Sequence, residues 1–133
     1  MRFTVDRIDH VVLNVSDVEI IASWYQRVLG MEREEFGRDQ RTALKFGGQK
    51  LNLRPVSADQ RSWITGANDR PGNGDLCFVT AVGCEEVLEH LRACGVTAIT
   101  GPVERLGALG PMHSVYCRDP EGNLIEIATY LTR

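Results

Sequence analysis

The sequence predicts an α+β fold in which two tandem βαβββ units form curved mixed sheets, together a half-barrel. The chain repeats itself: the run DHVVLNV at residues 9–15 matches GDLCFVT at residues 74–80, and an amphipathic stretch follows each run. Each stretch ends at a glycine, Gly30 or Gly95, that lies 20 residues after the second position of its run. A helix between strands can cover one face of a twisted sheet and leave the other face concave.

The two copies also agree at their ends. GGQKLNLRP at residues 47–55 matches EGNLIEIAT at residues 121–129. We therefore place the repeats at about residues 5–55 and 74–131, within a single domain of residues 1–133. A chain of 133 residues is long enough to bury one ordinary core.

The first copy predicts a strand, a helix and three further strands. Residues 7–15 are rich in β-branched side chains and predict a strand with His10 and Asn14 on one face. Ser16 or Asp17 then caps a helix that ends at the glycine. Its apolar residues recur at helical spacing, namely Ile20, Ile21, Trp24, Val28 and Leu29. The further strands are predicted near residues 31–36, 41–46 and 50–54, with a Gly47-Gly48 hairpin turn.

The stretch between the copies is polar and rich in Pro, Gly, Asn and Asp, which predicts a linker over residues 55–74. Its Trp63 has two interpretations. The ring could fold over a pocket, or it could anchor the linker to the surface.

The second copy predicts the same order of elements. A strand is expected over residues 75–80 and a helix over residues 85–94. Residues 101–111 predict a loop with no counterpart in the first copy. The DPEGN sequence at residues 119–123 then predicts a hairpin turn, which joins strands at residues 114–118 and 124–130.

Composition narrows the possible partners. The net charge is −3 and the basic residues are scattered, so nucleic acid and anionic membranes are not expected. No apolar run approaches the roughly 20 residues of a membrane-spanning helix, and the first residues lack the apolar core of a signal peptide, so we expect a cytoplasmic protein. The four cysteines form no CxxC pair and predict buried, reduced thiols.

The repeat places four polar residues at matching positions. His10 matches Asp75, and Asn52 matches Glu126. In a half-barrel the first strand of one copy can lie near the last strand of another, so these side chains would converge. An imidazole with two carboxylates suits a divalent cation such as Mn, Fe, Co, Ni or Zn, with water and substrate in the open positions.

Each ligand also has a structural interpretation. His10 could be a core histidine, and Asp75 could serve the turn after Gly74. Glu126 stands between Ile125 and Ile127 on a strand expected to be buried. A buried carboxylate is costly unless it is paired or binds a metal, which favours a functional role for Glu126.

Four more residues are candidates for substrate contacts or proton transfer. Lys50 and Arg54 share strand parity with Asn52, and they could receive an anionic group or be solvated strand ends. Tyr116 could donate a proton or fill the core. His113 has the opposite parity to the neighbouring Ser114, and it could be a general base at the rim or a surface histidine.

Several segments resemble one known superfamily. RIDHVVLNVSD, WYQRVLGME and YCRDPEGNLIEI, with the paired units, are similar to the vicinal oxygen chelate superfamily, which includes glyoxalase I, bleomycin-resistance proteins and extradiol dioxygenases. DLCF at residues 75–78 and the GPV…RDP pattern of residues 101–120 resemble most closely the glyoxalase-domain-containing protein 5 and virulence-protein-like group. The resemblance implies the glyoxalase/bleomycin resistance/dihydroxybiphenyl dioxygenase fold.

The resemblance also implies a site. It assigns the metal to His10, Asp75 and Glu126, and it makes Ser114 and Tyr116 pocket residues. Many relatives have His where Asp75 stands, and glyoxalase I has a carboxylate where Asn52 stands. These departures weaken both an extradiol dioxygenase assignment and classical glyoxalase chemistry.

We therefore expect a divalent-metal-dependent enzyme that binds a small oxygenated substrate through two neighbouring oxygens. The reaction would be that of a lyase or isomerase, and dioxygenase chemistry is the second choice. The alternative is a metal-free, ligand-sequestering protein of the bleomycin-resistance type, and a third possibility is a partner-binding module. The resemblance further implies a homodimer in which His10 of one chain joins Asp75 and Glu126 of the other.

Overall fold

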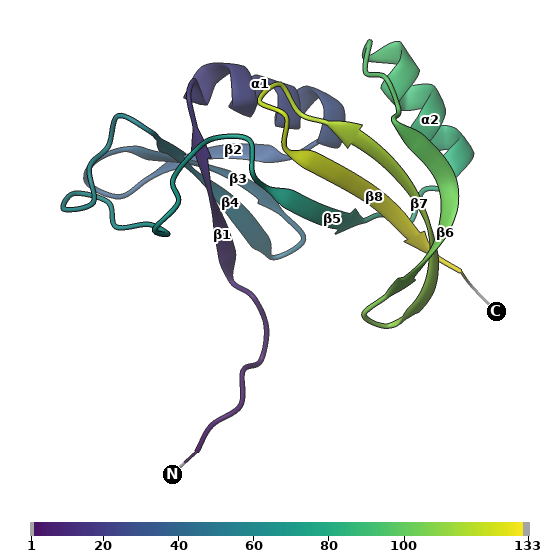
Figure 1. The fold of residues 1–133 in the computed structure, drawn as a ribbon, viewed down its shortest axis with the longest axis horizontal. Helices are drawn as coiled ribbons and strands as arrows, with labels where there is room; N and C mark the ends of the chain where they lie inside the picture. The colour runs from purple at the N-terminus through teal and green to yellow at the C-terminus, as the bar shows by residue number, and fades with distance from the viewer. Residues whose placement is uncertain (1, 132–133) are drawn as a thin grey trace. The chain divides into compact units, whose positions relative to one another are not determined.

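The structure, a computed structural model, describes residues 2–131, and these contain two helices and eight strands (Figure 1). The chain divides into two compact units, one ending at Arg70 and the other beginning at Pro71. Each unit has the order βαβββ and one open four-stranded mixed sheet. The predicted α+β class and its two repeated units are confirmed.

The first unit has the strand order β1-β4-β3-β2. Strand β1 runs parallel to β4, and the other neighbours are antiparallel. The hairpin between β3 and β4 turns at Gly47 and Gly48, both with positive φ, as a tight hairpin requires. Its elements are β1 (His10–Val15), α1 (Val18–Leu29), β2 (Glu32–Phe36), β3 (Arg41–Phe46) and β4 (Gln49–Pro55).

The second unit repeats this topology with the order β5-β8-β7-β6. Strand β5 runs parallel to β8, and β8, β7 and β6 are antiparallel. Its elements are β5 (Asp75–Val79), α2 (Cys84–Ala93), β6 (Thr100–Gly107), β7 (Gly110–Arg118) and β8 (Leu124–Tyr130).

Helix α1 begins and ends where the sequence indicates. The side chain of Asp17, not Ser16, caps it by accepting a hydrogen bond from the Ile20 backbone N–H, and Gly30 ends it in the left-handed region. Its apolar face packs against β2, β3 and β4 and covers one face of the sheet. Ile20 does not belong to that face, because it is 55% exposed. The buried residues of the helix are Ile21, Ala22, Trp24, Tyr25 and Val28.

The prediction of a loop over residues 101–111 is wrong. These residues form most of β6, a short turn, and the start of β7, and β6 pairs with β7 from Val103 to Gly107. Gly101 and Pro102 are joined by a cis peptide at an irregularity in the pairing. Gly, Pro and charged side chains concealed the strand, because β6 is an edge strand that can carry such residues.

The prediction of four buried thiols is also wrong. Cys117 is buried, Cys84 and Cys94 are partly buried, and Cys77 is exposed. All four are free thiols. Neither helix among residues 2–131 is long and apolar enough to cross a membrane.

Candidate functional site

The sheet of the second unit has two unlike faces. Helix α2 packs on β7 and β8, and the wholly buried Cys117 and Ile125 lie on the helix-covered face. Strand alternation places Glu126 on the opposite face. We call the face of each sheet opposite to its helix the open face, although some of its side chains are buried. Glu126 pairs with Cys77 of β5 on one side and with Tyr116 of β7 on the other. These three side chains therefore form one row across the open face.

Asp75 joins this row from β5. It lies two residues before Cys77 and so points to the same face. Its neighbour across the sheet is Leu124, two residues before Glu126, which makes Asp75 and Glu126 diagonal neighbours. The two predicted carboxylate ligands thus share one face of adjacent strands.

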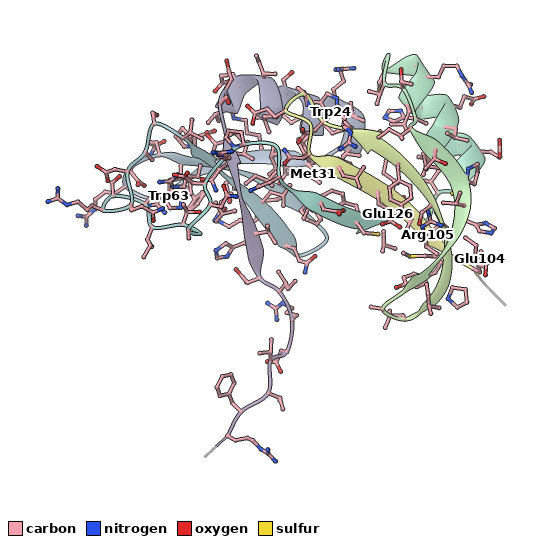
Figure 2. The ribbon with its side chains drawn as sticks, viewed as in Figure 1. Trp24, Met31, Trp63, Glu104, Arg105 and Glu126 are labelled. Atoms are coloured by element: carbon pink, nitrogen blue, oxygen red, sulfur yellow. The ribbon has the colours of Figure 1, made fainter. Side chains whose placement is uncertain are left out.

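Glu126, labelled in Figure 2, is distinguished from the rest of the row by a buried carboxylate oxygen. Its Oε2 atom is buried and has no hydrogen-bond partner among residues 2–131. Although Cys77 is exposed as a residue, partial burial of its thiol raises the pKa of Cys77 to about 11, with further contributions from the charge of Glu126, a hydrogen bond to it, and the charge of Asp75. The Cys77 thiol is therefore protonated at neutral pH, and the Oε2 atom of Glu126 is available for a ligand.

Tyr116 is held from β6 by Arg105, a residue that sequence reasoning missed. The Arg105 Nε donates to the Tyr116 Oη at 3.0 Å, and its Cζ lies 5.4 Å from the centre of the Tyr116 ring. Arg105 also donates from Nη1 to the backbone carbonyl of Glu104 at 3.0 Å. Residue 105 lies within the predicted loop, and the run Val103-Glu104-Arg105-Leu106 has no alternation of apolar and polar residues that would indicate a strand.

The structure separates Ser114 from His113. Ser114 is fully buried on the face that carries Tyr116, and its Oγ has no hydrogen-bond partner among the described residues. His113 is exposed, and its neighbours across the sheet are Glu104 and Thr129. It points to the opposite face, so the structure does not bring His113 together with Tyr116 or Glu126.

In the first unit, His10 and Asn52 also share the open face of their sheet. His10 pairs with Lys50, and Val12 pairs with Asn52. The His10 side chain is 45% exposed, and its Nδ1 lies 3.0 Å from an oxygen of Asp9. Asn52 is buried, and its Oδ1 has no hydrogen-bond partner among residues 2–131.

The cationic side chains of Lys50 and Arg54 on this face both contact other groups of the protein. The Lys50 Nζ lies 3.5 Å from the centre of the Phe36 ring. Arg54 is completely buried, and it donates hydrogen bonds to the carbonyls of Trp63 and Ala58 and to Oδ1 of Asn14. Interpreting Arg54 as a solvated strand end is therefore wrong, because its guanidinium is bound by the linker. Its predicted contact with substrate stays a prediction.

Trp63 is the buried residue of the linker. It is 9% exposed, and the Arg41 guanidinium lies 3.9 Å from its ring centre. The ring lines a hollow of about 300 Å³ that also includes Val18 and Leu53. The linker thus folds back onto the first unit.

The predicted metal ligands fall into two groups. Asp75 and Glu126 share one sheet of the second unit, whereas His10 belongs to the first unit. Within either unit, as far as the described residues go, no three His, Cys, Asp or Glu side chains lie together as a metal site. The donor chemistry nevertheless fits a divalent ion, because Glu126 has a buried oxygen without a partner and Asp75 is its diagonal neighbour.

Comparisons with known proteins agree with this architecture. Residues 7–127 match the family model of the Glyoxalase/Bleomycin resistance protein/Dioxygenase superfamily. The chain is 40% identical over 131 residues to the virulence protein STM3117 of Salmonella typhimurium, which covers 98% of this chain and 89% of that relative. It is 38% identical over 129 residues to the glyoxalase domain-containing protein RDO1 of Mycosarcoma maydis, with 97% and 71% covered.

Solved structures show the same relationship. The crystal structure of STM3117 matches with a TM-score of 0.91 and 41% identity, over 97% of this chain and 100% of that one. The integron cassette protein VCH_CASS1 of V. cholerae matches with a TM-score of 0.93 and 40% identity, over 98% and 100%.

More distant structures share the fold alone. A lactoylglutathione lyase from Agrobacterium tumefaciens matches at a TM-score of 0.71 and 23% identity, over 95% of both chains. The antibiotic-binding protein TnmS3 from Streptomyces sp. CB03234 matches at 0.74 and 19%, over 98% and 100%. The family model and the close relatives together show that the chain belongs to the Glyoxalase/Bleomycin resistance protein/Dioxygenase superfamily, the vicinal oxygen chelate superfamily that its motifs resemble.

Proposed function

We propose that the protein is a divalent-metal-dependent enzyme of this superfamily, with His10, Asp75 and Glu126 as ligands of the ion. The observation that carries the proposal is the buried, unpartnered Oε2 of Glu126. Leaving a carboxylate oxygen buried without a partner is costly, and a bound cation would compensate that cost. When bound, such an ion supplies Lewis-acid stabilisation of negative charge on substrate oxygens, which suits lyase or isomerase chemistry.

Tyr116 is the residue we propose to handle protons. Its Oη accepts a hydrogen bond from Arg105, so its own hydroxyl hydrogen is free to donate to a substrate oxygen. It is the direct neighbour of Glu126 across the sheet, which places donor and ligand side by side. Ser114 and Asn52, each with a buried oxygen lacking a partner, are the proposed further substrate contacts.

We further propose that the site is shared across a homodimer, with His10 from one chain and the two carboxylates from the partner. The support is the division of the donor set, since His10 lies in the first unit and Asp75 and Glu126 lie in the second. Single-domain members of the superfamily commonly pair in this way.

Mixing two inactive variants tests the shared site. Neither His10→Ala nor Glu126→Ala should bind metal as a homodimer. If the ligands come from two chains, the heterodimer keeps one intact site and binds one ion per dimer. If they come from one chain, both sites of the heterodimer are broken and no ion is bound. Metal content of the isolated heterodimer decides between these outcomes.

Metal content is also the first test of the proposed function itself. We expect about one transition metal per chain by mass spectrometry, after purification without chelators or a metal-affinity tag. Glu126→Gln, which keeps the side-chain volume, should lose the ion. Glu104→Gln, on exposed β6 of the same unit, should keep it.

A protein without metal, even after incubation with Mn, Fe, Co, Ni and Zn salts, would contradict the proposal. The remaining candidate would then be the metal-free, ligand-sequestering function. A ligand that binds equally well to the wild type and to Glu126→Gln would support that function.

A further inference from the structure

We propose that Arg105 determines substrate specificity by binding a carboxylate group of the substrate. This inference rests on the proposed function and narrows its substrate to a small carboxylic acid that carries neighbouring oxygens. Arg105 lies on β6 of the sheet that carries Glu126 on β8 (Figure 2). It is absent from the ligand set and from the residues that the sequence predicts for the site.

The first step of the argument is position. Arg105 pairs with Met112 on β7, and alternation along β7 places Met112 and Tyr116 on the same open face. The guanidinium reaches along this face to hydrogen-bond the Tyr116 Oη at 3.0 Å. Since Tyr116 is the neighbour of Glu126, the cation contacts the residue beside the proposed metal ligand.

The second step is orientation. Two contacts fix the guanidinium, the bond to the Tyr116 Oη and the bond from Nη1 to the Glu104 carbonyl. A guanidinium that is fixed before binding loses less side-chain entropy when a ligand arrives. Arg105 is thus prepared for a ligand in the way that a mobile surface arginine is not.

The third step is unused hydrogen-bonding capacity. A guanidinium has five N–H donors, and the two bonds of Arg105 use two of them. No carboxylate among residues 2–131 forms an ion pair with Arg105, whereas Arg33 and Arg41 are paired with acidic side chains. The remaining N–H groups can therefore form the two parallel hydrogen bonds that a carboxylate accepts.

The fourth step is the charge of the ligand. The same face carries the carboxylates of Asp75 and Glu126, whose two negative charges balance a divalent ion in the proposed function and so leave the guanidinium of Arg105 as the added positive charge. The other guanidinium of this face, Arg118, lies at the opposite end of β7 and donates to the Gly122 carbonyl in the turn. One available guanidinium matches the charge of a monoanion, and a carboxylate is the monoanion that fits a planar guanidinium.

The test compares acids with their uncharged amides. We would measure binding of lactate, pyruvate and mandelate, of the matching amides, and of inorganic phosphate by calorimetry, with Mn-loaded and metal-free protein. The variants are Arg105→Gln, Arg105→Lys and the control Arg118→Gln, which removes a guanidinium from the same face of β7.

We expect the wild type to prefer at least one acid to its amide by roughly tenfold or more, as charge-assisted hydrogen bonds typically give. Arg105→Gln should lose this preference, Arg105→Lys should keep part of it, and Arg118→Gln should keep it whole. Equal binding of acids and amides, no binding of any acid, or equal losses in Arg105→Gln and Arg118→Gln would overturn the proposal. Tighter, Arg105-dependent binding of phosphate would also overturn it.

Metal content separates this proposal from the one on which it rests. Arg105→Gln should keep the metal content of the wild type, because Arg105 is not a ligand. Acids that fail to bind a protein with full metal content contradict the carboxylate site alone. Arg105-dependent acid binding by a chain that takes up no metal contradicts the metal-dependent function alone.

Discussion

The sheets of the two units have the same topology but opposite chemistry in their central rows. We define a central row as the three facing residues on the open face of each sheet. In the first unit the row is Ala43, Asn52 and Val12, and in the second it is Tyr116, Glu126 and Cys77. The first row is nearly apolar, whereas the second has three ionisable groups. A repeat that specifies one backbone therefore leaves the chemistry of its open face free to differ.

One arginine on each open face also differs between the units, both in burial and in the number of N–H donors that the protein occupies. Arg54 in the first unit is buried and bound by the linker, so it holds the fold together. Arg105 in the second unit is exposed and has donors to spare. Burial and the number of occupied donors, not residue type, distinguish a structural arginine from a candidate binding arginine.

The turn before the last strand of each unit contains a hydrogen bond that both copies of the repeat share. Gln49 and Asn123 occupy matching positions, and each ties its last strand to the segment that precedes its first strand. Gln49 donates to the Ile8 carbonyl at 2.9 Å, and the Asn123 Oδ1 accepts from the Gly74 N–H at 2.7 Å. The two units thus share a device that joins parallel neighbouring strands.

Removing the buried arginine of the first unit should have the largest effect. Arg54→Met leaves the carbonyls of Trp63 and Ala58 and the amide of Asn14 without their charged donor. We expect a loss of about 3 kcal/mol in the free energy of unfolding, measured in urea. The exposed Arg38→Met should change the free energy little. A loss no larger than that of Arg38→Met would show that the linker does not depend on Arg54.

The matched turn residues should differ by their burial. Asn123 is 1% exposed and also donates to the Asp119 carboxylate at 2.7 Å, so Asn123→Ala should cost about 2 kcal/mol of unfolding free energy. Gln49 makes its bond near the surface, so Gln49→Ala should cost about 0.5 kcal/mol. Equal losses in urea unfolding would mean that both units depend on this device to the same degree.

The sequence predicts the framework well because the framework follows from local patterns. The Asp17 cap, the Gly30 stop and the Gly47-Gly48 turn each depend on residues within a few positions of one another. Strand β6 was missed because its pairing with β7, and not its composition, makes it a strand. The face of Glu126 followed from strand parity, yet the exposed Cys77 beside it did not follow from its residue type.

The role of a cation was the least predictable feature. Lys50 and Arg54 stand on one strand with the same parity, and nothing local indicates that one lies over Phe36 and the other under the linker. Those partners come from distant parts of the chain. Arg105 was missed because it lies in the segment predicted as a loop, whereas its partner Tyr116 lies in the predicted strand over residues 114–118.

The neighbouring carboxylates of Glu126 and Asp75 should control the reactivity of the Cys77 thiol. This thiol has a raised pKa of about 11, caused first by burial and then by Glu126 and Asp75. Glu126→Gln removes a negative charge, so the pKa of Cys77 should fall and its alkylation by iodoacetamide at pH 8 should become several-fold faster. Mass spectrometry of the Cys77 peptide measures the rate, and Glu104→Gln is the matched control. An unchanged rate would show that Glu126 does not influence the thiol.

The same thiol gives a pH dependence with a definite sign. The folded pKa of Cys77 lies above the ordinary thiol value of 9.0, so the unfolded chain loses this proton first as the pH rises. The stabilising contribution is complete below pH 9.0 and is lost as the pH approaches about 11. Cys77→Ser should therefore flatten the alkaline decline of the free energy of unfolding. A decline that is equally steep in Cys77→Ser would assign it to other groups.

The smallest effect is expected at Lys50, the cation that the first unit places over an aromatic ring. Lys50→Gln removes the contact of the Lys50 Nζ with the Phe36 ring and should cost about 0.5 kcal/mol of unfolding free energy at a partly exposed site. Phe36→Leu should cost more, because it also removes part of a partly buried aromatic side chain, and the two changes together should cost less than their sum. A fully additive double variant would mean that the contact contributes nothing, and Lys50 would then be available to receive a substrate anion as the sequence predicts.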